Sequence, residues 1–96
     1  MDVGDVYHAD LNEERRRRVV VISSARFNRL AGRALIVPAE HGPPDEVLDP
    51  WRVPIDGIVY AVDHVRSVPA ARLLERVDRV PVGAVNGILR ALRAIT

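Results

Sequence analysis

Four consecutive arginines, Arg15 to Arg18, lead directly into an apolar, β-branched segment that begins at Val19. Arginine side chains stay charged, and their planar forked group can bind two phosphate oxygens at once. A cluster of arginines at the start of a buried strand therefore favours contact with a phosphate backbone. The alternative is a solvated loop whose charges keep the edge of a sheet from pairing with another chain.

The three histidines are candidates for proton transfer, because histidine titrates closest to neutral pH. His41 and His64 are the better candidates, since His8 falls inside a predicted strand. Lone histidines are, however, more often ordinary surface or core residues. The chain contains no cysteine, and the spacing of the histidines does not fit a zinc site. We therefore expect neither a metal ion nor another cofactor.

The composition indicates one small domain of 96 residues. Its hydrophobic content of 48% is enough for a core, and its net charge of +1 argues against a broadly basic coat for nucleic acid. All 14 basic residues are arginines, which the codon preference of a G+C-rich genome would also produce. The apolar runs are too short to span a membrane, and the first ten residues do not resemble a signal peptide. We expect a cytoplasmic protein.

Short β-branched and apolar segments separated by Gly and Pro predict several strands. These strands cover residues 6–11, 18–23, 33–39, 51–55 and 58–68. Pro54 confines the fourth of them to an edge or a bulge, and a Gly-Pro-Pro sequence makes residues 40–49 a loop. Short connections favour an antiparallel, partly closed barrel. We expect six side chains to be largely buried: Val20, Ile22, Leu35, Val37, Val53 and Val62.

Helical patterns are fewer and lie mainly near the end of the chain. Residues 24–32 form either a helical turn or a polar loop that Gly32 ends, and residues 70–77 suit a short helix. The last helix is predicted over 82–95, with Pro81 at its entry and an amphipathic pattern of apolar residues and arginines. A domain this small gains stability from a partner, so the amphipathic helix favours a homodimer.

Several short motifs follow one another in a recognisable order. They are Gly4-Asp5 with Asp10, Arg17 six residues before Ser23, Asn28 with Gly32, "LIVP" ending at Pro38, "PWRV" at 50–53, "DHVRS" at 63–67 and Arg72-Leu73. Each motif is weak by itself, but together they span essentially the whole chain. In this order the sequence resembles the MazF/PemK toxins, the ribonucleases of bacterial toxin–antitoxin pairs.

The resemblance implies an SH3-like small β-barrel of the MazF, CcdB and Kid type, with a C-terminal helix and usually two copies in a homodimer. The implied activity is metal-independent, sequence-selective cleavage of single-stranded RNA, restrained by a MazE-like antitoxin. Arg17 occupies the catalytic arginine position, and Glu40 lies where the family has Thr or Ser. The residues expected to bind RNA are Arg15, Arg16, Arg18, His41, His64 and Arg66.

Two departures from the family pattern leave alternatives open. Glu40 could act as a general base on the 2′-hydroxyl, or it could form an inert ion pair with Arg17. The loop between Asp10 and Arg17 is shorter than the family norm, so the RNA sequence preference cannot be carried over. One alternative is a catalytically inactive relative that binds RNA or an antitoxin. Another is a toxin of the same fold that acts on a protein target.

Overall fold

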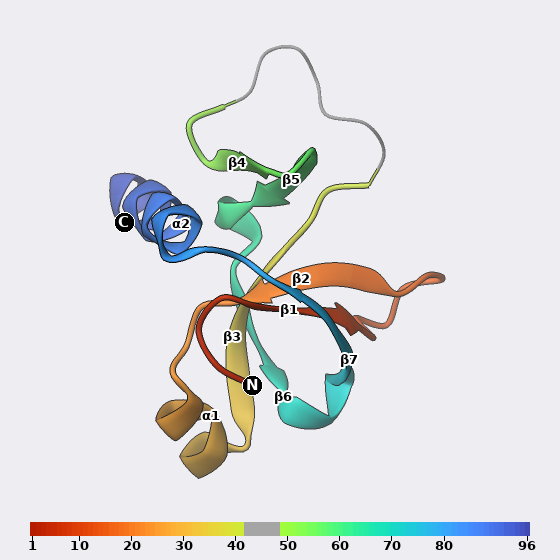
Figure 1. Cartoon of the computed structure of the whole chain (residues 1–96). Helices are drawn as coiled ribbons and strands as arrows, with labels where there is room; N and C mark the ends of the chain where they lie inside the picture. The colour runs from red at the N-terminus through yellow and green to blue at the C-terminus, as the bar shows by residue number, and fades with distance from the viewer. Residues whose placement is uncertain (42–48) are drawn as a thin grey trace.

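The computed structural model describes residues 1–41 and 49–96, and Figure 1 shows their arrangement. The strands are β1 (Asp5–Ala9), β2 (Arg17–Val21), β3 (Arg33–Pro38), β4 (Arg52–Ile55), β5 (Ile58–Ala61), β6 (Arg66–Pro69) and β7 (Leu73–Arg79). The α-helices are α1 (Ala25–Ala31) and α2 (Val82–Ile95), and two short 3-10 turns are η1 (Val62–His64) and η2 (Ala70–Arg72). Neither α-helix is both long and apolar enough to cross a membrane.

Five strands form one sheet in the order β6-β3-β2-β1-β7, and β4 and β5 form a separate hairpin. Every strand pair is antiparallel, as the sequence predicts. A single bridge between Ala39 and Tyr60 connects the end of β3 to the hairpin. Within the described residues the outer strands β6 and β7 are not hydrogen-bonded to each other. The expected barrel is therefore not confirmed, because the sheet stays open along this edge.

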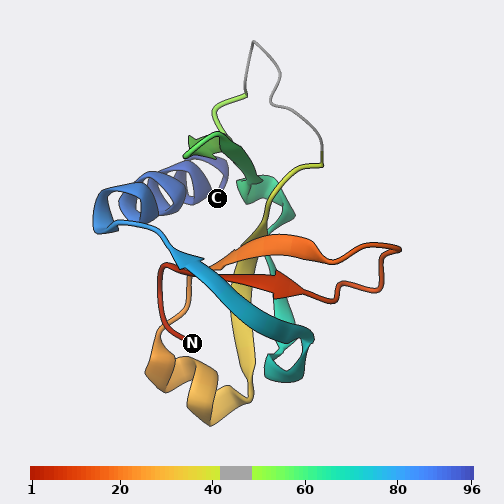
Figure 2. The same cartoon turned by 45° about the vertical axis from the view of Figure 1, so that its right-hand side comes forward.

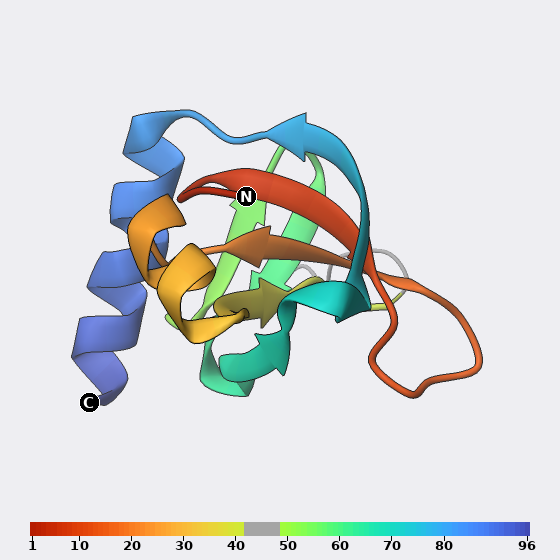
Figure 3. The ribbon, with the colours of Figure 1, turned by 90° about the horizontal axis from the view of Figure 1, so that it is seen from below.

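Apolar side chains cover both faces of the five-stranded sheet. On one face, Val6, Val20 and Val37 pack with residues of the hairpin, η1 and α2. Figures 1 and 2 show α2 and the β4–β5 hairpin lying together on one side of the sheet. On the other face, Val19, Val21 and other small apolar residues pack inside the curve of the sheet. The view in Figure 3 shows how strongly the strands wrap around this second core.

The elements with the clearest sequence patterns form as expected. The β-branched residues Val19, Val20 and Val21 make β2 the central strand, and all three are fully buried. Helix α2 covers 82–95, has Pro81 as its N-cap and buries Val85 with two further residues against the sheet. Helix α1 forms over the segment for which the sequence left a helix or a loop open, and Gly32 ends it in the left-handed conformation.

Three expectations are corrected by the structure. Residues 58–68 do not form one strand, because η1 separates β5 from β6. Residues 70–77 are not a helix; they form η2 and the start of β7, which pairs with β1 along its length. Leu35 is 37% exposed, although it lies on the same face of β3 as the buried Val37, because the pairing with β2 ends at Ile36 and leaves Leu35 beyond it. Of the other side chains expected in the core, Val20, Val37 and Val62 are buried, and Ile22 and Val53 are half-buried.

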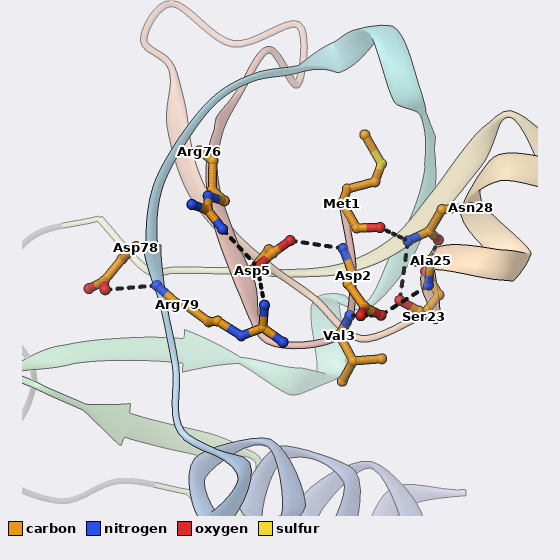
Figure 4. Close-up of polar contacts among 10 residues, drawn as sticks. All are labelled: Met1, Asp2, Val3, Asp5, Ser23, Ala25, Asn28, Arg76, Asp78 and Arg79. Atoms are coloured by element: carbon orange, nitrogen blue, oxygen red, sulfur yellow. Dashed lines mark hydrogen bonds and ion pairs between the residues drawn. The ribbon is translucent and has the colours of Figure 1, made fainter.

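The N-terminal residues connect α1 to the sheet (Figure 4). The Asp2 carboxylate accepts hydrogen bonds from the backbone N–H groups of Val3 at 2.7 Å and of Ala25 at 3.0 Å. These two bonds hold the pKa of Asp2 below its ordinary value of 3.8. Asn28 is buried in α1, and its side-chain N–H groups donate to the carbonyl oxygens of Met1 and Ser23.

Gly4 and Asp5 connect the start of β1 to its neighbouring elements. Asp5 is buried, and its carboxylate lies 3.7 Å from Arg76 and 3.4 Å from Arg79 of β7 (Figure 4). Gly4 has φ +90°, and a Cβ added there would lie 3.2 Å from the Val80 carbonyl oxygen. The two residues therefore attach β1 closely to β7 and to the entry of α2.

Candidate active site

The guanidinium group of Arg17 lies at the centre of a cluster that joins three segments. Arg17 begins β2 and pairs with Ala9 of β1, and Glu13 lies in the loop between these strands. The Nη2 atom of Arg17 donates to Glu13 Oε2 at 2.6 Å and lies 2.7 Å from His41 Nε2. The same histidine nitrogen is 3.7 Å from Glu13 Oε2. An arginine, a carboxylate and a histidine therefore meet at one point.

The cluster is shielded on its strand side and open on its histidine side. The Arg17 side chain is 17% exposed, whereas Glu13 is 34% and His41 is 59% exposed. Figure 1 shows the loop between β1 and β2 and the segment after β3 leaving the sheet on the same side. A ligand can therefore reach the imidazole while the sheet holds Arg17 in place.

The contact between Arg17 and His41 defines the protonation state of the imidazole. A guanidinium group can only donate hydrogen bonds, so His41 Nε2 accepts, which requires a neutral ring with its proton on Nδ1.

These groups match the needs of phosphodiester cleavage without a metal. Attack by a 2′-hydroxyl requires a proton acceptor, and the growing charge on the phosphoryl oxygens requires a fixed positive group. His41 offers the acceptor, and Arg17 offers the charge. Across residues 1–41 and 49–96, no three His, Cys, Asp or Glu side chains gather closely enough to hold a metal ion.

Arg18 belongs to the other face of β2. Its Nη2 atom donates to Asp78 at 3.2 Å, and its side chain is 29% exposed. It also lies near the hydroxyl of the buried Tyr60, where burial raises the tyrosine pKa and Arg18 partly opposes that rise. Arg18 is thus held in a structural pairing and is separated from the Arg17 cluster by the strand itself.

Arg15 and Arg16 are the exposed members of the arginine run. Both lie in the loop between β1 and β2, and neither forms an ion pair with any residue that the structure describes. Their position beside Glu13 and Arg17 suits contact with phosphates on either side of a reacting group. The four arginines therefore divide into one cluster residue, one structural residue and two exposed residues.

Glu40 does not pair with Arg17. Its Oε1 atom accepts a hydrogen bond from Arg52 Nε at 2.5 Å, and the opposite side of the Arg52 guanidinium binds Asp63. His64 is 54% exposed and lies 3.6 Å from Asp63. Of the remaining residues expected to bind RNA, Arg66 is exposed on the outer strand β6.

Glu13 is the member of the cluster that sequence reasoning missed. It lies four residues before Arg17, a spacing that brings two side chains together in a helix but has no such meaning in a loop. Only the turn between β1 and β2 returns Glu13 to Arg17. The one signal in the sequence was the acidic pair Glu13-Glu14 next to an arginine run.

The comparison of sequences assigns a family. The sequence model of the PemK-like, MazF-like toxins of type II toxin–antitoxin systems matches residues 2–96. No curated protein sequence matches the chain.

The comparison of structures finds the same fold in several solved proteins. MazF in a MazE–MazF crystal structure from Deinococcus radiodurans superposes with a TM-score of 0.81 at 19% identity, over 99% of this chain and 93% of that chain. An endoribonuclease from a mycobacterial species gives a TM-score of 0.79 at 21% identity, over 98% and 88% of the two chains. A mycobacterial endoribonuclease in complex with its cognate antitoxin gives 0.78 at 19% identity, over 98% and 92%. At these identities the structures establish the fold, and the sequence match over residues 2–96 establishes that the chain belongs to the PemK-like, MazF-like toxin family of type II toxin–antitoxin systems.

Proposed function

We propose that this protein is a metal-independent endoribonuclease that cleaves single-stranded RNA at the Arg17 cluster with a preference for particular sequences. The observation that carries this proposal is the meeting of Arg17, His41 and Glu13 within 3.7 Å of one another. Membership of a toxin family supports it. The structural relative that is an endoribonuclease from a mycobacterial species agrees with it.

In the proposed reaction, the 2′-oxygen of one nucleotide attacks its own phosphorus, and the bond from phosphorus to the next 5′-oxygen breaks. The scissile phosphate takes the place of His41 on the Arg17 guanidinium. His41 Nε2 accepts the 2′-hydroxyl proton and then returns it to the departing 5′-oxygen. Glu13 stabilises the imidazolium while it is charged, and Arg17 stabilises the extra charge on the phosphoryl oxygens. The products are a 2′,3′-cyclic phosphate and a 5′-hydroxyl.

The test uses the purified full chain and a long single-stranded RNA in the presence of EDTA. We expect cleavage at recurring sequences, with 2′,3′-cyclic phosphate and 5′-hydroxyl ends. Arg17→Ala and His41→Asn should each lower the cleavage rate strongly. His8→Asn serves as the matched histidine control and should retain the cleaving activity, because His8 lies on β1 beside Glu75. Ends that carry a 5′-phosphate would contradict the mechanism.

The second candidate function is binding of RNA or an antitoxin without cleavage. Two observations favour it: the Glu13 carboxylate already neutralises Arg17, and Glu40 replaces the hydroxyl residue of the family. RNA binding by the wild-type chain with no cleavage of any substrate would select this candidate.

We also propose that the protein is a homodimer restrained by a MazE-like antitoxin. The relatives from Deinococcus radiodurans and from a mycobacterial species are described in complexes with MazE and with a cognate antitoxin. Exposed apolar residues on α2, including Val82 at 75% and Leu89 at 41%, offer a surface for association. Inhibition of RNA cleavage by the co-purified product of a neighbouring small gene would test the antitoxin.

A further inference from the structure

Arg52 connects three segments that are distant in the sequence. It begins β4, and its side chain is only 16% exposed. Its guanidinium binds Glu40, which follows β3, and Asp63, which lies in η1. Burial lowers the pKa of Arg52, but the hydrogen bonds and charges of Asp63 and Glu40 outweigh burial and raise it. Arg52 is therefore a permanently charged centre between two carboxylates.

Glu40 and His41 are consecutive residues that contact different arginines. The bridge between Ala39 and Tyr60, and a hydrogen bond from the Glu40 N–H to the Val59 oxygen at 2.8 Å, fix the backbone up to Glu40. From there the Glu40 side chain extends to Arg52, whereas the His41 ring extends to Arg17. Glu40 and His41 are adjacent in the chain, so the position of the Glu40 backbone limits where the His41 ring can lie.

We propose that Arg52 is a positioning residue for the Arg17 cluster: by binding Glu40, it holds the segment that presents His41 to Arg17. The kinetic part of this proposal rests on the proposed function, but the contact between His41 and Arg17 is present without RNA. Glu40 then acts through Arg52 and not on the RNA, because its oxygen is already engaged by a guanidinium group. The negative charge of Glu40 is thus balanced by the positive charge of Arg52, twelve positions later in the chain.

The first experiment observes His41 directly by NMR in the full chain without RNA. The readouts are nuclear Overhauser contacts between the His41 ring and the Arg17 side chain, and the 15N shifts of the ring. Arg52→Met and Glu40→Gln should both weaken the contacts and move the shifts, and Arg52→Lys should restore them in part. Asp63→Asn is the matched control, because it alters the other carboxylate on Arg52 without touching the segment that carries His41.

The second experiment measures RNA cleavage by the same variants. Arg52→Met and Glu40→Gln should each lower kcat by about 10- to 100-fold with little change in KM, as expected when a reacting group is misplaced. The double variant should be no slower than either single variant, because both remove one interaction. Arg52→Lys should recover part of the lost kcat.

Two results would overturn the proposal. One is an unchanged contact between His41 and Arg17 in a folded Arg52→Met protein. The other is an equal loss of this contact in Asp63→Asn, which would show that the network supports the fold in general. If Arg52→Met does not fold, Glu40→Gln provides the same test with almost no change in shape. A wild-type chain that cleaves no RNA while His41 responds as expected would refute the proposed function and leave the positioning of His41 by Arg52 standing.

Discussion

Arg17 and Arg18 are neighbours in the chain, and their guanidinium groups bind partners on opposite faces of β2. Arg17 binds Glu13 and lies against His41, whereas Arg18 binds Asp78 and lies near Tyr60. The alternation of side chains along a strand produces this division. The arginine run is therefore not one basic surface, and its members should respond differently to substitution.

Arg17→Ala should reduce the rate of RNA cleavage by about 10²–10³, by analogy with the loss of one donor from an oxyanion site. Arg18→Ala should leave cleavage nearly intact. It should lower the free energy of unfolding, because it removes the guanidinium group that contacts the buried Tyr60 and pairs with the half-exposed Asp78. Initial rates and urea unfolding curves of the two variants measure both effects. Equal rates for Arg17→Ala and the wild type would exclude this cluster as the active site.

Arg15→Ala and Arg16→Ala should weaken RNA binding and change kcat little. Each substitution removes one exposed positive charge, so the plot of log affinity against log salt concentration should become less steep by about 0.7 for single-stranded RNA. Fluorescence anisotropy at several salt concentrations measures this slope. Arg66→Ala, on the outer strand β6, tests whether RNA also reaches that edge.

Tyr60 should make the protein sensitive to alkali. Burial raises the pKa of Tyr60 above its ordinary value of 10.0 in the folded state. Because the folded pKa is higher than the unfolded pKa, folding favours the neutral form of Tyr60. This contribution to the free energy of unfolding is fully present below pH 10.0, and it is lost as the pH rises through the folded pKa. Urea unfolding between about pH 9 and 11 should show this loss in the wild type and in Tyr7→Phe, but much less of it in Tyr60→Phe. A Tyr60→Phe variant with an unchanged pH dependence would contradict the assignment.

Gly4→Ala should destabilise the protein by about 1–3 kcal/mol, since it combines an unfavourable backbone conformation with a crowded site. The added Cβ would lie 3.2 Å from the Val80 oxygen and 3.4 Å from Val85. Gly57→Ala is the matched control, because Gly57 also has a positive φ but has nothing within 4 Å of the added Cβ. Thermal unfolding should give Gly4→Ala a lower Tm than Gly57→Ala, and the reverse order would show that crowding against Val80 and Val85 is unimportant.

The homodimer should bury roughly 1,200–2,000 Å² in total, the size of a standard interface. Leu89 borders a surface pocket of about 360 Å³ between α2 and the N-terminal segment, and Val82 and Val85 line it together with the charged residues Asp2 and Arg79. Leu89→Asp should therefore shift the protein toward a monomer in light scattering at micromolar concentration. Leu74→Asp is a suitable control, since Leu74 is similarly exposed (45%) but lies on β7. A wild-type chain that is monomeric under these conditions would count against the dimer.

The parts of the fold that could be predicted from the sequence depend on local patterns. The β-branched run of β2 and the helical spacing of α2 each specify an element without information from the rest of the chain. The composition of the segment that begins with Ala70 predicts a helix, and only the pairing with β1 makes the part from Leu73 a strand. Leu35 and Val37 could not be distinguished, since only the folded structure shows that the pairing of β3 with β2 includes Val37 and ends before Leu35.

The candidate site, like the fold, could be predicted only where local chemistry was enough. The chemistry of arginine and histidine favours the run Arg15 to Arg18 together with His41 and His64, and only the family resemblance singles out Arg17. The pairing of Glu13 with Arg17, and that of Glu40 with Arg52, depends on how loops return to the sheet. Partners in loops follow no periodicity, so these pairs appear only in the folded structure.

The link between β6 and β7 determines the curvature of the whole sheet. These strands are its two outer members, yet only the three residues of η2 separate them in the chain. In a flat sheet they would lie four strand spacings apart, about 19 Å. The four residue steps from Pro69 to Leu73 reach at most about 14 Å. The link is therefore a covalent tether that is too short for a flat sheet, and the arc of strands that carries Arg17 is maintained by chain length as well as by side-chain packing.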